Sequence, residues 1–596
     1  MAKSGARWVI SGCLILYAVM SGACGNSGAS NAGPDASIGQ DSSGDGSSSG
    51  APRADGGGSG TATGSASGSG GDGGAKAAEG GTKSGSSGAG SSGVDGGNMS
   101  TSSSGGMSAS SSGSASGSSS ASTSDSSVLQ HHKNATRDGV YVDKAFTAAA
   151  MATMHRDTTF SASVNGSMYA QPLYVENGPG GQEAFIIATE ANHVAAIGGT
   201  GTTLWDHPYG TPVSAGLPCG NVSPLGITGT PVIDTASRSI YFDAMTQGPK
   251  HLIHAVSLDD GSEKSGWPVD VSATISGFDS SVQNQRGALL FLNGTVYVPY
   301  GGHYGDCGNY HGWVIGVPSG NPSGAIAWHT DQSDGGIWAH GGLSTDGTSI
   351  FLATGNTTQP GLIFTPPQSW AGGDAVIRLS QALAFSTQSP PAADYFVPSD
   401  WMQLDSNDQD LGGTNPVLFD SGGQHLVAIL GKNGYLYVLN RDNLGGVSSA
   451  TGTLVSNGEL MGAPAAYTTS QGTYVAFRAN QAAVNCPSGK GSGNLGVAKI
   501  TGTNPPAATV VWCSTQPTDL GSPMITTTDG TSSVVVWDAD NRLYGYDGDT
   551  GQLVYDGSKV AADALTAPIQ YFNAAIAAKG RIVVGDQAGN LSVFKP

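Results

Sequence analysis

The sequence predicts an all-β fold, an eight-bladed β-propeller of four-stranded antiparallel blades, on the strength of three observations. A unit recurs eight times between residues 170 and 596, at a spacing of roughly 45 to 75 residues that is typical of repeat architectures. Each unit opens with a small residue, usually proline, and continues with an apolar run, a strand, a tight polar turn and a second strand. No long helical period occurs in this region. The openings are Pro172, Pro231, Ala288, Gly341, Pro416, Pro464, Pro523 and Pro568.

The hairpins within the units are marked by turn dipeptides. Residues 532–555 (SSVVVWDADNRLYGYDGDTGQLVY) are the clearest copy, and residues 426–441 and 580–594 repeat the pattern. Pairs that favour a positive φ separate several apolar runs. These pairs are Asn293-Gly294, Asp346-Gly347, Asn433-Gly434 and Asp529-Gly530. Seven blades result instead if the long stretch over residues 357–410 contains a loop insertion.

The last unit ends the chain and lacks a fourth strand. Residues 158–164 alternate so that Phe160, Ala162 and Val164 share one face of a strand. We therefore expect this segment to complete the last blade and close the ring. Closure leaves only short, protected strand edges.

The first 127 residues are expected to lie outside the propeller. Lys3 and Arg7 precede a short apolar run over residues 8–20, which is typical of an export signal over residues 1–23 and too short to span a bilayer. The small residues before Cys24 resemble the bacterial lipobox, which implies lipidation of Cys24. The glycine after this cysteine, Gly25, resembles that of lipoproteins sent on to the outer membrane. The alternative is an ordinary signal peptide. Residues 24–127 are almost entirely Gly, Ser, Ala, Thr and Asp, so we expect a disordered tether.

Charge and cysteine content constrain residues 128–596, the expected propeller domain. The net charge of the whole chain, −20, argues against nucleic acid as a partner and against membrane contact other than through the lipid anchor. Four cysteines in an exported domain indicate two disulfides. Cys486 and Cys513 bracket one repeat, so we pair them and pair Cys219 with Cys307; two other pairings stay open. No two cysteines have CxxC spacing, which disfavours a structural metal.

From residue 135 to residue 596 the repeats resemble those of quinoprotein alcohol dehydrogenases, which depend on pyrroloquinoline quinone (PQQ). The resemblance rests on the DADN turn with LYGYD and TG in residues 532–555, on residues 226–235 (GITGTPVIDT) and on residues 169–175 (YAQPLYV). It implies an eight-bladed propeller and, in a catalytic member, PQQ and calcium as cofactors. Propellers without activity share such repeats, so the resemblance is specific for the fold rather than for the activity.

Four positions match the active site of these dehydrogenases in chain order. The resemblance implies that Trp338 stacks under the quinone, Asn356 binds calcium, Asp410 is the catalytic base with Asp408 as the fallback, and Lys432 contacts the quinone oxygens. A tryptophan face suits a planar cofactor, and an asparagine oxygen suits a hard cation. An aspartate can abstract a proton, and a lysine stabilises developing negative charge. Each position also has a structural alternative. Trp338 would be core packing, Asn356 a strand end, Asp410 an aspartate bonded to its own turn, and Lys432 a solvated lysine at a hairpin tip.

The chain also departs from the family. It has no adjacent pair of cysteines, and Cys307 occupies the position of a calcium-binding glutamate, with Asp306 beside it as a substitute ligand. No CxxCH motif is present, so electrons need an external acceptor. His303, Cys307 and His311 recur every four residues, which allows a metal site, although polar loop residues beside a disulfide are the favoured interpretation.

Two functions therefore stay open from the sequence: an oxidoreductase of a small alcohol or a sugar, or a non-catalytic propeller at the cell envelope with a protein or glycan partner. The second resembles the lipoprotein scaffold of the outer-membrane barrel-assembly machinery, and the missing cysteine pair, the missing glutamate and the tether favour it. Either would be an outer-membrane lipoprotein, periplasmic or surface-exposed. Glycan binding would use rim aromatics, namely Tyr304, Tyr310 and Trp313. We expect His131 and His132, next to the tether, to be solvated. No GxSxG stands on a strand-to-helix turn, and no phosphate-binding loop is present.

Overall fold

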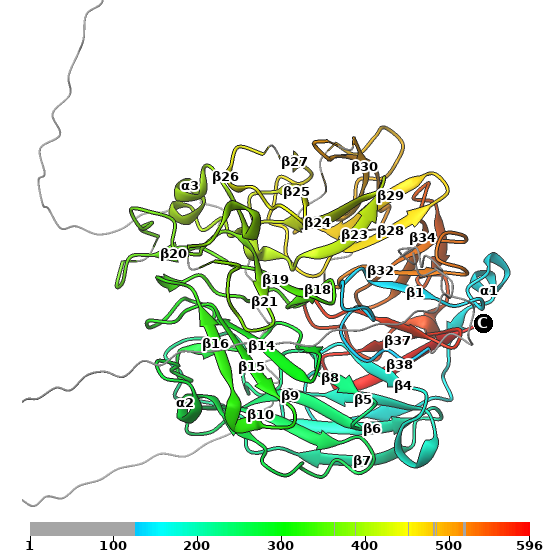
Figure 1. The fold of residues 1–596 in the computed structure, drawn as a ribbon. Helices are drawn as coiled ribbons and strands as arrows, with labels where there is room; N and C mark the ends of the chain where they lie inside the picture. Colours follow the sequence, from blue (N-terminus) through cyan, green and yellow to red (C-terminus); the bar gives the residue numbers. More distant parts are fainter. Residues whose placement is uncertain are drawn as a thin grey trace, which may run out of the picture. The chain divides into compact units, whose positions relative to one another are not determined.

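The computed structural model describes residues 126–596, apart from residues 363, 388, 451, 481, 482, 484, 503 and 517–519. This part of the chain forms an eight-bladed β-propeller (Figure 1), so the predicted fold is confirmed and the seven-bladed alternative is wrong. The expected signal over residues 1–23, the lipidated Cys24 and nearly all of the tether over residues 24–127 lie outside the described residues. None of the helices described is long and apolar enough to cross a membrane.

Each blade is an antiparallel sheet that the chain builds from the inner strand outward. Blades 1 and 2 consist of β4 (Leu173–Val175), β5 (Ala184–Ala188), β6 (His193–Gly198) and β7 (Thr203–Pro208), then β8 (Val232–Asp234), β9 (Ser239–Thr246), β10 (Lys250–Ser257) and β11 (Val269–Asp270). Blades 3 and 4 consist of β12 (Gln283–Asn284), β13 (Leu290–Leu292), β14 (Thr295–Gly302), β15 (Trp313–Pro318) and β16 (Ile326–His329), then β18 (Ser344–Thr345), β19 (Ser349–Ala353), β21 (Val376–Ser380) and β22 (Tyr395–Pro398).

The second half of the ring repeats this order. Blades 5 and 6 consist of β23 (Val417–Ser421), β24 (Gln424–Leu430), β25 (Tyr435–Asn440) and β27 (Thr453–Leu454), then β28 (Ala465–Thr469), β29 (Gly472–Arg478), β30 (Leu495–Thr501) and β31 (Ala507–Cys513). Blades 7 and 8 consist of β32 (Met524–Thr527), β33 (Val535–Ala539), β34 (Leu543–Asp547) and β35 (Leu553–Asp556), then β36 (Ile576–Ala578), β37 (Arg581–Gly585) and β38 (Asn590–Lys595).

Short elements connect or extend the blades. The strands outside the four-stranded pattern are β1 (Val140–Val142), β2 (His155–Arg156), β3 (Ala162–Ser163), β17 (Ser333–Asp334), β20 (Thr357–Thr358) and β26 (Gly446–Ser448). The helices are α1 (Ala148–Ala152), α2 (Val271–Thr274), α3 (Trp401–Ser406), η1 (Pro179–Gly181), η2 (Pro322–Gly324), η3 (Ala392–Asp394), η4 (Leu411–Gly413) and η5 (Ala561–Asp563). The stretch over residues 357–410 carries β21 and β22, so it builds blade 4 rather than replacing a blade.

The repeat openings found in the sequence mark the inner strands. Five prolines each stand one residue before an inner strand, where a missing backbone N–H costs no ladder hydrogen bond; they are Pro172, Pro231, Pro416, Pro464 and Pro523. The predicted turns also hold, because Asn293 and Gly294 have φ values of 48° and 81° and the other three glycines have positive φ as well.

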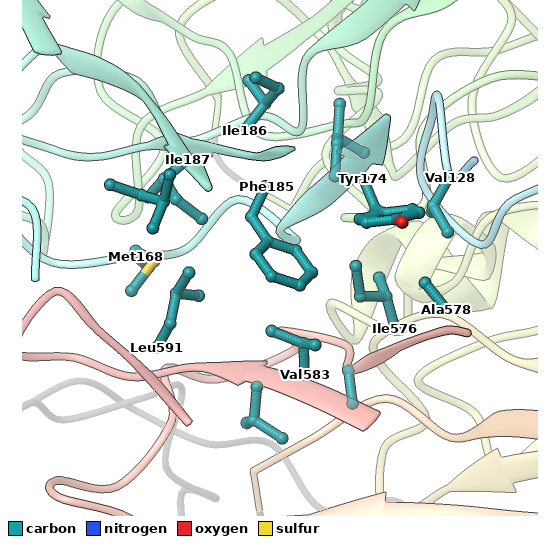
Figure 2. Packing of buried hydrophobic residues seen from close by; sticks show 14 of the residues in the cluster. Val128, Met168, Tyr174, Phe185, Ile186, Ile187, Ile576, Ala578, Val583 and Leu591 are labelled. Atoms are coloured by element: carbon teal, nitrogen blue, oxygen red, sulfur yellow. The ribbon is translucent and has the colours of Figure 1, made fainter. Parts of the chain in front are cut away.

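The N-terminal part of the described chain closes the ring. β2 and β3 both pair antiparallel with β38, and Ala162 lies opposite Leu591. The closing segment is the predicted one, although its pairing begins at His155, earlier than expected. Blades 1 and 8 then share a continuous apolar core, in which the fully buried Phe185 points toward Val583 (Figure 2).

The segment over residues 128–143 runs along the inner circle of the ring and contacts all eight blades. Its backbone bonds to the inner strands of six blades through Tyr174, Ile233, Thr345, Leu418, Ala466 and Ile525. Arg137, fully buried, donates to the carbonyl oxygen of Leu289 in blade 3 at 2.8 Å. Asp143 accepts from the backbone N–H of Gly580 in blade 8 at 2.6 Å. We call residues 128–143 the inner segment.

The expectation that His131 and His132 are solvated is wrong. Both rings are buried and stack with their centroids 4.3 Å apart, because the inner segment carries them into the ring. The backbone N–H of His132 donates to Gln171 Oε1 at 3.1 Å. Burial lowers the pKa of His132 to about 4, so this imidazole is neutral at neutral pH.

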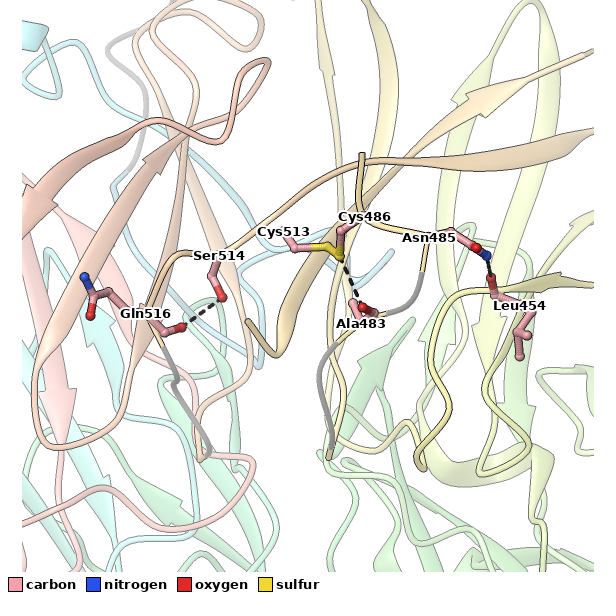
Figure 3. The surroundings of a disulfide bond; sticks show 7 residues. All are labelled: Leu454, Ala483, Asn485, Cys486, Cys513, Ser514 and Gln516. Carbon is pink, nitrogen blue, oxygen red and sulfur yellow. Dashed lines mark hydrogen bonds between the residues drawn. A yellow bond between two sulfur atoms is a disulfide. The ribbon is translucent and has the colours of Figure 1, made fainter. Parts of the chain in front are cut away.

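Two disulfides join neighbouring parts of the ring, Cys219–Cys307 and Cys486–Cys513, with Cα–Cα distances of 6.0 and 5.9 Å. These are the pairs that the repeat positions led us to expect. The second bond ties the β29–β30 connection to the end of β31 in blade 6 (Figure 3).

Candidate functional site

A cavity of about 220 Å³ lies on one face of the propeller, and residues of blades 3, 4 and 5 line it. The six residues to which the sequence assigned active-site roles all belong to this lining: Asp306, Trp338, Asn356, Asp408, Asp410 and Lys432. The sequence therefore identified residues that the fold brings to one place.

The convergence follows from the direction of the strands. In an antiparallel blade, the start of the inner strand and the end of the second strand lie at the same face. Trp338 and Asp410 precede the inner strands β18 and β23, whereas Asn356 and Lys432 follow the second strands β19 and β24. Residues from both kinds of loop therefore meet on this face.

Lys432 forms the electrostatic centre of the cavity. Its ammonium lies 2.7 Å from Asp410 Oδ2 and 3.1 Å from Asp408 Oδ1, and it faces the Trp338 ring at 5.5 Å from the centroid. Its side chain is only 7% exposed, so Lys432 is not a solvated lysine at a hairpin tip. A cation over an aromatic face gains further stabilisation when it is desolvated.

Asp410 also holds the loop that carries Asn356. Its Oδ1 accepts the backbone N–H of Asn356 at 2.7 Å. A Cβ on Gly355 would lie 2.3 Å from that same oxygen, so the glycine at this position permits the close approach. The side-chain nitrogen of Asn356 donates to Asp408 at 3.3 Å, and its Oδ1 is buried without a partner.

Further carboxyl groups make the cavity acidic. Tyr310 donates its hydroxyl to Asp306 Oδ1 at 2.7 Å, and burial together with the charges of Asp410 and Asp408 raises the pKa of Asp306. Burial raises the pKa of Asp334 to about 6, even though Asp334 accepts a hydrogen bond from Thr358. The surplus of acidic groups favours a positively charged occupant.

The fit to calcium is partial. An unpartnered, buried amide oxygen on Asn356 and a carboxylate on Asp306 or Asp408 are hard oxygen donors of the kind that Ca²⁺ prefers. However, no three His, Cys, Asp or Glu side chains of the described residues are grouped to hold a metal. Since calcium takes six to eight oxygen ligands, a cation here would need ligands from a bound molecule or from water.

Some expectations about the surroundings are wrong. Trp313 is not at the rim, because it packs in the core between blades 2 and 3, and Tyr310 is also buried. Tyr304 lines the cavity and is 41% exposed. Cys307 is used in a disulfide and the Nδ1 of His311 bonds to a backbone carbonyl, so neither is available with His303 for a metal site.

Sequence reasoning missed several lining residues, among them Arg286, Asp334, Thr358 and Phe364. Only Asp334 left a local signal. It precedes two glycines in the sequence, a combination that marks a turn, and in the structure it has a φ of 68°. The other three could be found only from the fold.

Comparisons with known proteins agree with this geometry at the level of the fold. The quinohemoprotein alcohol dehydrogenase of Comamonas testosteroni is 14% identical, with 79% of this chain and 80% of that chain covered and a TM-score of 0.50. For the dehydrogenase ADHIIG of Pseudomonas putida HK5 the identity is 12%, the coverage is the same and the TM-score is 0.52. BamB from Moraxella catarrhalis is 13% identical, with 74% of this chain and 98% of that chain covered. Its TM-score is 0.43, so this similarity supports no conclusion.

No protein-family model matches the sequence, and no curated protein matches it either. At these identities, the similarity to solved structures shows the fold alone. The chain is thus an eight-bladed β-propeller of the same fold as the quinohemoprotein alcohol dehydrogenases.

Proposed function

We propose that the protein is a PQQ-dependent oxidoreductase of a small alcohol or a sugar. The observation that carries this proposal is the convergence of Trp338, Asn356, Asp410 and Lys432, from separate loops, on one cavity. Core packing or solvated turns would not require these four side chains to meet. The similarity in fold to two quinohemoprotein alcohol dehydrogenases supports the proposal.

Each residue has a role that its surroundings support. Trp338 offers a flat face for a planar ring, and Lys432 places positive charge beside that face. Asp410 accepts the proton of the substrate hydroxyl, since each of its oxygens still has a lone pair besides the one used for Asn356 or Lys432. PQQ, when bound, supplies the acceptor for the two electrons that leave the substrate.

Calcium, if it accompanies PQQ, would be held by Asn356 and by the nearby carboxylates of Asp306 or Asp408. The unpartnered Oδ1 of Asn356 is the donor that most clearly lacks another role. Tyr304 and Phe364, which line the cavity with 41% and 42% exposure, provide apolar surface that limits the access of water.

One observation favours a second function, a non-catalytic propeller that binds a protein or glycan at the cell envelope. Cys307, at the position where the resemblance implies a calcium-binding glutamate, is bonded to Cys219 instead. In that case the exposed aromatics Tyr304 and Phe364 would contact the partner directly.

A calorimetric titration of PQQ into the purified protein, with calcium and then with EDTA, tests the first function. We expect saturable binding that Trp338→Ala weakens on the order of 10- to 100-fold, because the variant loses the stacking area. Trp328→Ala, in the outer strand of blade 3, is the matched control and should bind like the parent. Asp410→Asn should keep binding but lose dye-linked oxidation of alcohols and sugars. Absence of saturable binding would refute the proposal and favour the second function.

We also propose that the protein is exported and anchored through Cys24. The two disulfides support an oxidising compartment. Mass spectrometry of the mature N-terminus and fractionation of a Cys24→Ala variant test the anchor. An unmodified N-terminus in the membrane fraction would contradict it.

A further inference from the structure

Two buried carboxyl groups, Asp374 and Asp405, lie against each other behind the cavity. Asp374 stands just before β21 and Asp405 belongs to α3, and neither is exposed. Each carboxyl group is among the causes that shift the pKa of the other, so the two side chains are close neighbours. Neither residue lines the cavity, so any effect on the site has to pass through other residues.

Asp374 holds the backbone beside the proposed base. Its Oδ1 accepts the N–H of Leu411, the residue after Asp410, at 2.8 Å. The backbone N–H of Asp374 in turn donates to the carbonyl oxygen of Gly355, next to Asn356, at 2.9 Å. This one residue therefore connects both site loops.

Asp405 holds the other loop. Its Oδ1 accepts the N–H of Thr357, the residue after Asn356, at 3.0 Å. Since Asp410 accepts the N–H of Asn356 itself at 2.7 Å, three carboxyl groups fasten the loop of residues 355–357 to the loop of residues 410–411. Four separate parts of blades 4 and 5 meet in this network.

The pair cannot be doubly ionised at low cost. The charged groups that act on the pair are acidic. Asp405 and Asp410 act on Asp374, and Asp410 and Asp334 act on Asp405. Tyr437 also faces Asp374. Burial and these charges raise the pKa of Asp405 to about 7 and that of Asp374 well above its usual range. Adjacent buried carboxyls then hold one proton between them.

The remaining oxygens agree with this arrangement. The Oδ2 atoms of Asp374 and Asp405 are buried, and neither has an N–H or O–H donor as a partner in the structure. An acid that faces a carboxylate satisfies both atoms with a single O–H···O bond. A buried oxygen without such a bond would be costly.

We propose that Asp374 and Asp405 are positioning residues: a carboxyl pair that shares one proton and fixes Asp410 and Asn356 in their places. The inference rests on the proposed function, for which Asp410 is the base. With one negative charge instead of two, the pair bonds to both backbone N–H groups and repels the Asp410 carboxylate less.

The test compares an isosteric with a truncated variant. In Asp374→Asn the amide oxygen can still accept from Leu411 and the amide N–H can replace the shared proton, so we expect near-parent behaviour. Asp374→Ala removes both bonds. We expect its kcat to fall on the order of 10- to 100-fold while KM changes little, because the base is displaced and the cavity lining stays. Asp394→Asn, in a buried ion pair of the same blade, is the matched control.

A second readout does not depend on activity. Hydrogen exchange, followed by mass spectrometry, should speed up in the peptides with Thr357 and Leu411 in Asp374→Ala, but not in Asp374→Asn or in the Asp394→Asn control. Equal damage from Asn and Ala at position 374 would overturn the shared proton. Unchanged exchange in Asp374→Ala would overturn the positioning role. If the parent protein neither binds PQQ nor oxidises alcohols, the proposed function fails, while the exchange result still decides the proposal on the pair.

Discussion

Lys432→Met removes the ammonium that contacts both Asp408 and Asp410, while it keeps most of the length of the side chain. The side chains of Lys432 and Asp410 are 7% and 9% exposed, whereas Asp408 is 42% exposed. Breaking a buried pair costs about 3 to 5 kcal/mol, because one charge stays buried and unpaired, whereas an exposed pair contributes at most about 1 kcal/mol. Since this pair lies at a cavity, we expect Lys432→Met to lower the free energy of unfolding by about 3 kcal/mol at pH 8.

The dependence on pH gives this prediction a second check. An aspartate without its partner can take up a proton, at a cost of about 1.4 kcal/mol for each pH unit above an ordinary pKa near 3.9. At pH 5, protonation of the aspartate limits the loss of unfolding free energy to about 1.5 kcal/mol. The destabilisation by Lys432→Met should therefore be roughly half as large at pH 5 as at pH 8.

Urea unfolding, followed by tryptophan fluorescence and by far-UV circular dichroism, measures the effect where the two transitions coincide. Asp410→Asn and the double variant complete a cycle, and the double variant should lose about 1.5 to 2 kcal/mol less than the sum of the single variants. A loss below about 1 kcal/mol at pH 8, or strict additivity, would refute a buried, coupled pair.

Three further predictions concern the scaffold. Replacing Cys486 and Cys513 by serine should lower the free energy of unfolding by about 3.5 kcal/mol, the loop-entropy value for a separation of 27 residues, and a urea midpoint equal to that of the parent would contradict it. Phe185→Ala should cost about 3 to 5 kcal/mol, since the fully buried ring joins blades 1 and 8; thermal unfolding with Phe185→Leu as the milder control checks this. Burial raises the pKa of Glu190 to about 7, so the folded state binds a proton there more tightly than the unfolded state does. The stability that this proton contributes is present below about pH 4 and is lost as the pH rises to about 7. Glu190→Gln should consequently raise the urea midpoint at pH 8 and not at pH 4.

The sequence predicts those parts of the molecule that depend on local patterns. A proline before an apolar run marks an inner strand, and an Asn-Gly pair marks a hairpin, because both act through the backbone of one or two residues. The favoured count of eight blades followed from these signals, and the closing strand followed from the alternation over residues 158–164. Trp338 and Lys432 were recognised by resemblance, since their order along the chain matches that of a known family.

Other features depend on contacts that no local pattern reveals. His131 and His132 follow a polar, glycine-rich stretch and read as solvated, but partners in distant blades draw them inside. Asp374 and Asp405 look like ordinary loop and helix-end aspartates, and only the fold shows that each holds a backbone N–H beside the cavity. Trp313 was misplaced for the converse reason, since a loop context concealed a strand residue in the core.

The inner segment has a consequence for the order of assembly. It contacts blades from the first to the last, and Asp143 meets Gly580 across a separation of 437 residues. A chain that is synthesised from its N-terminus makes this segment before any of the blades, yet its last contacts arise only when blade 8 has been made. Contacts between such distant residues are slow to form, and until then the apolar faces of the terminal blades stay open to other chains. Truncation of β38 should therefore leave an incomplete, aggregation-prone ring, rather than a propeller that merely lacks one strand.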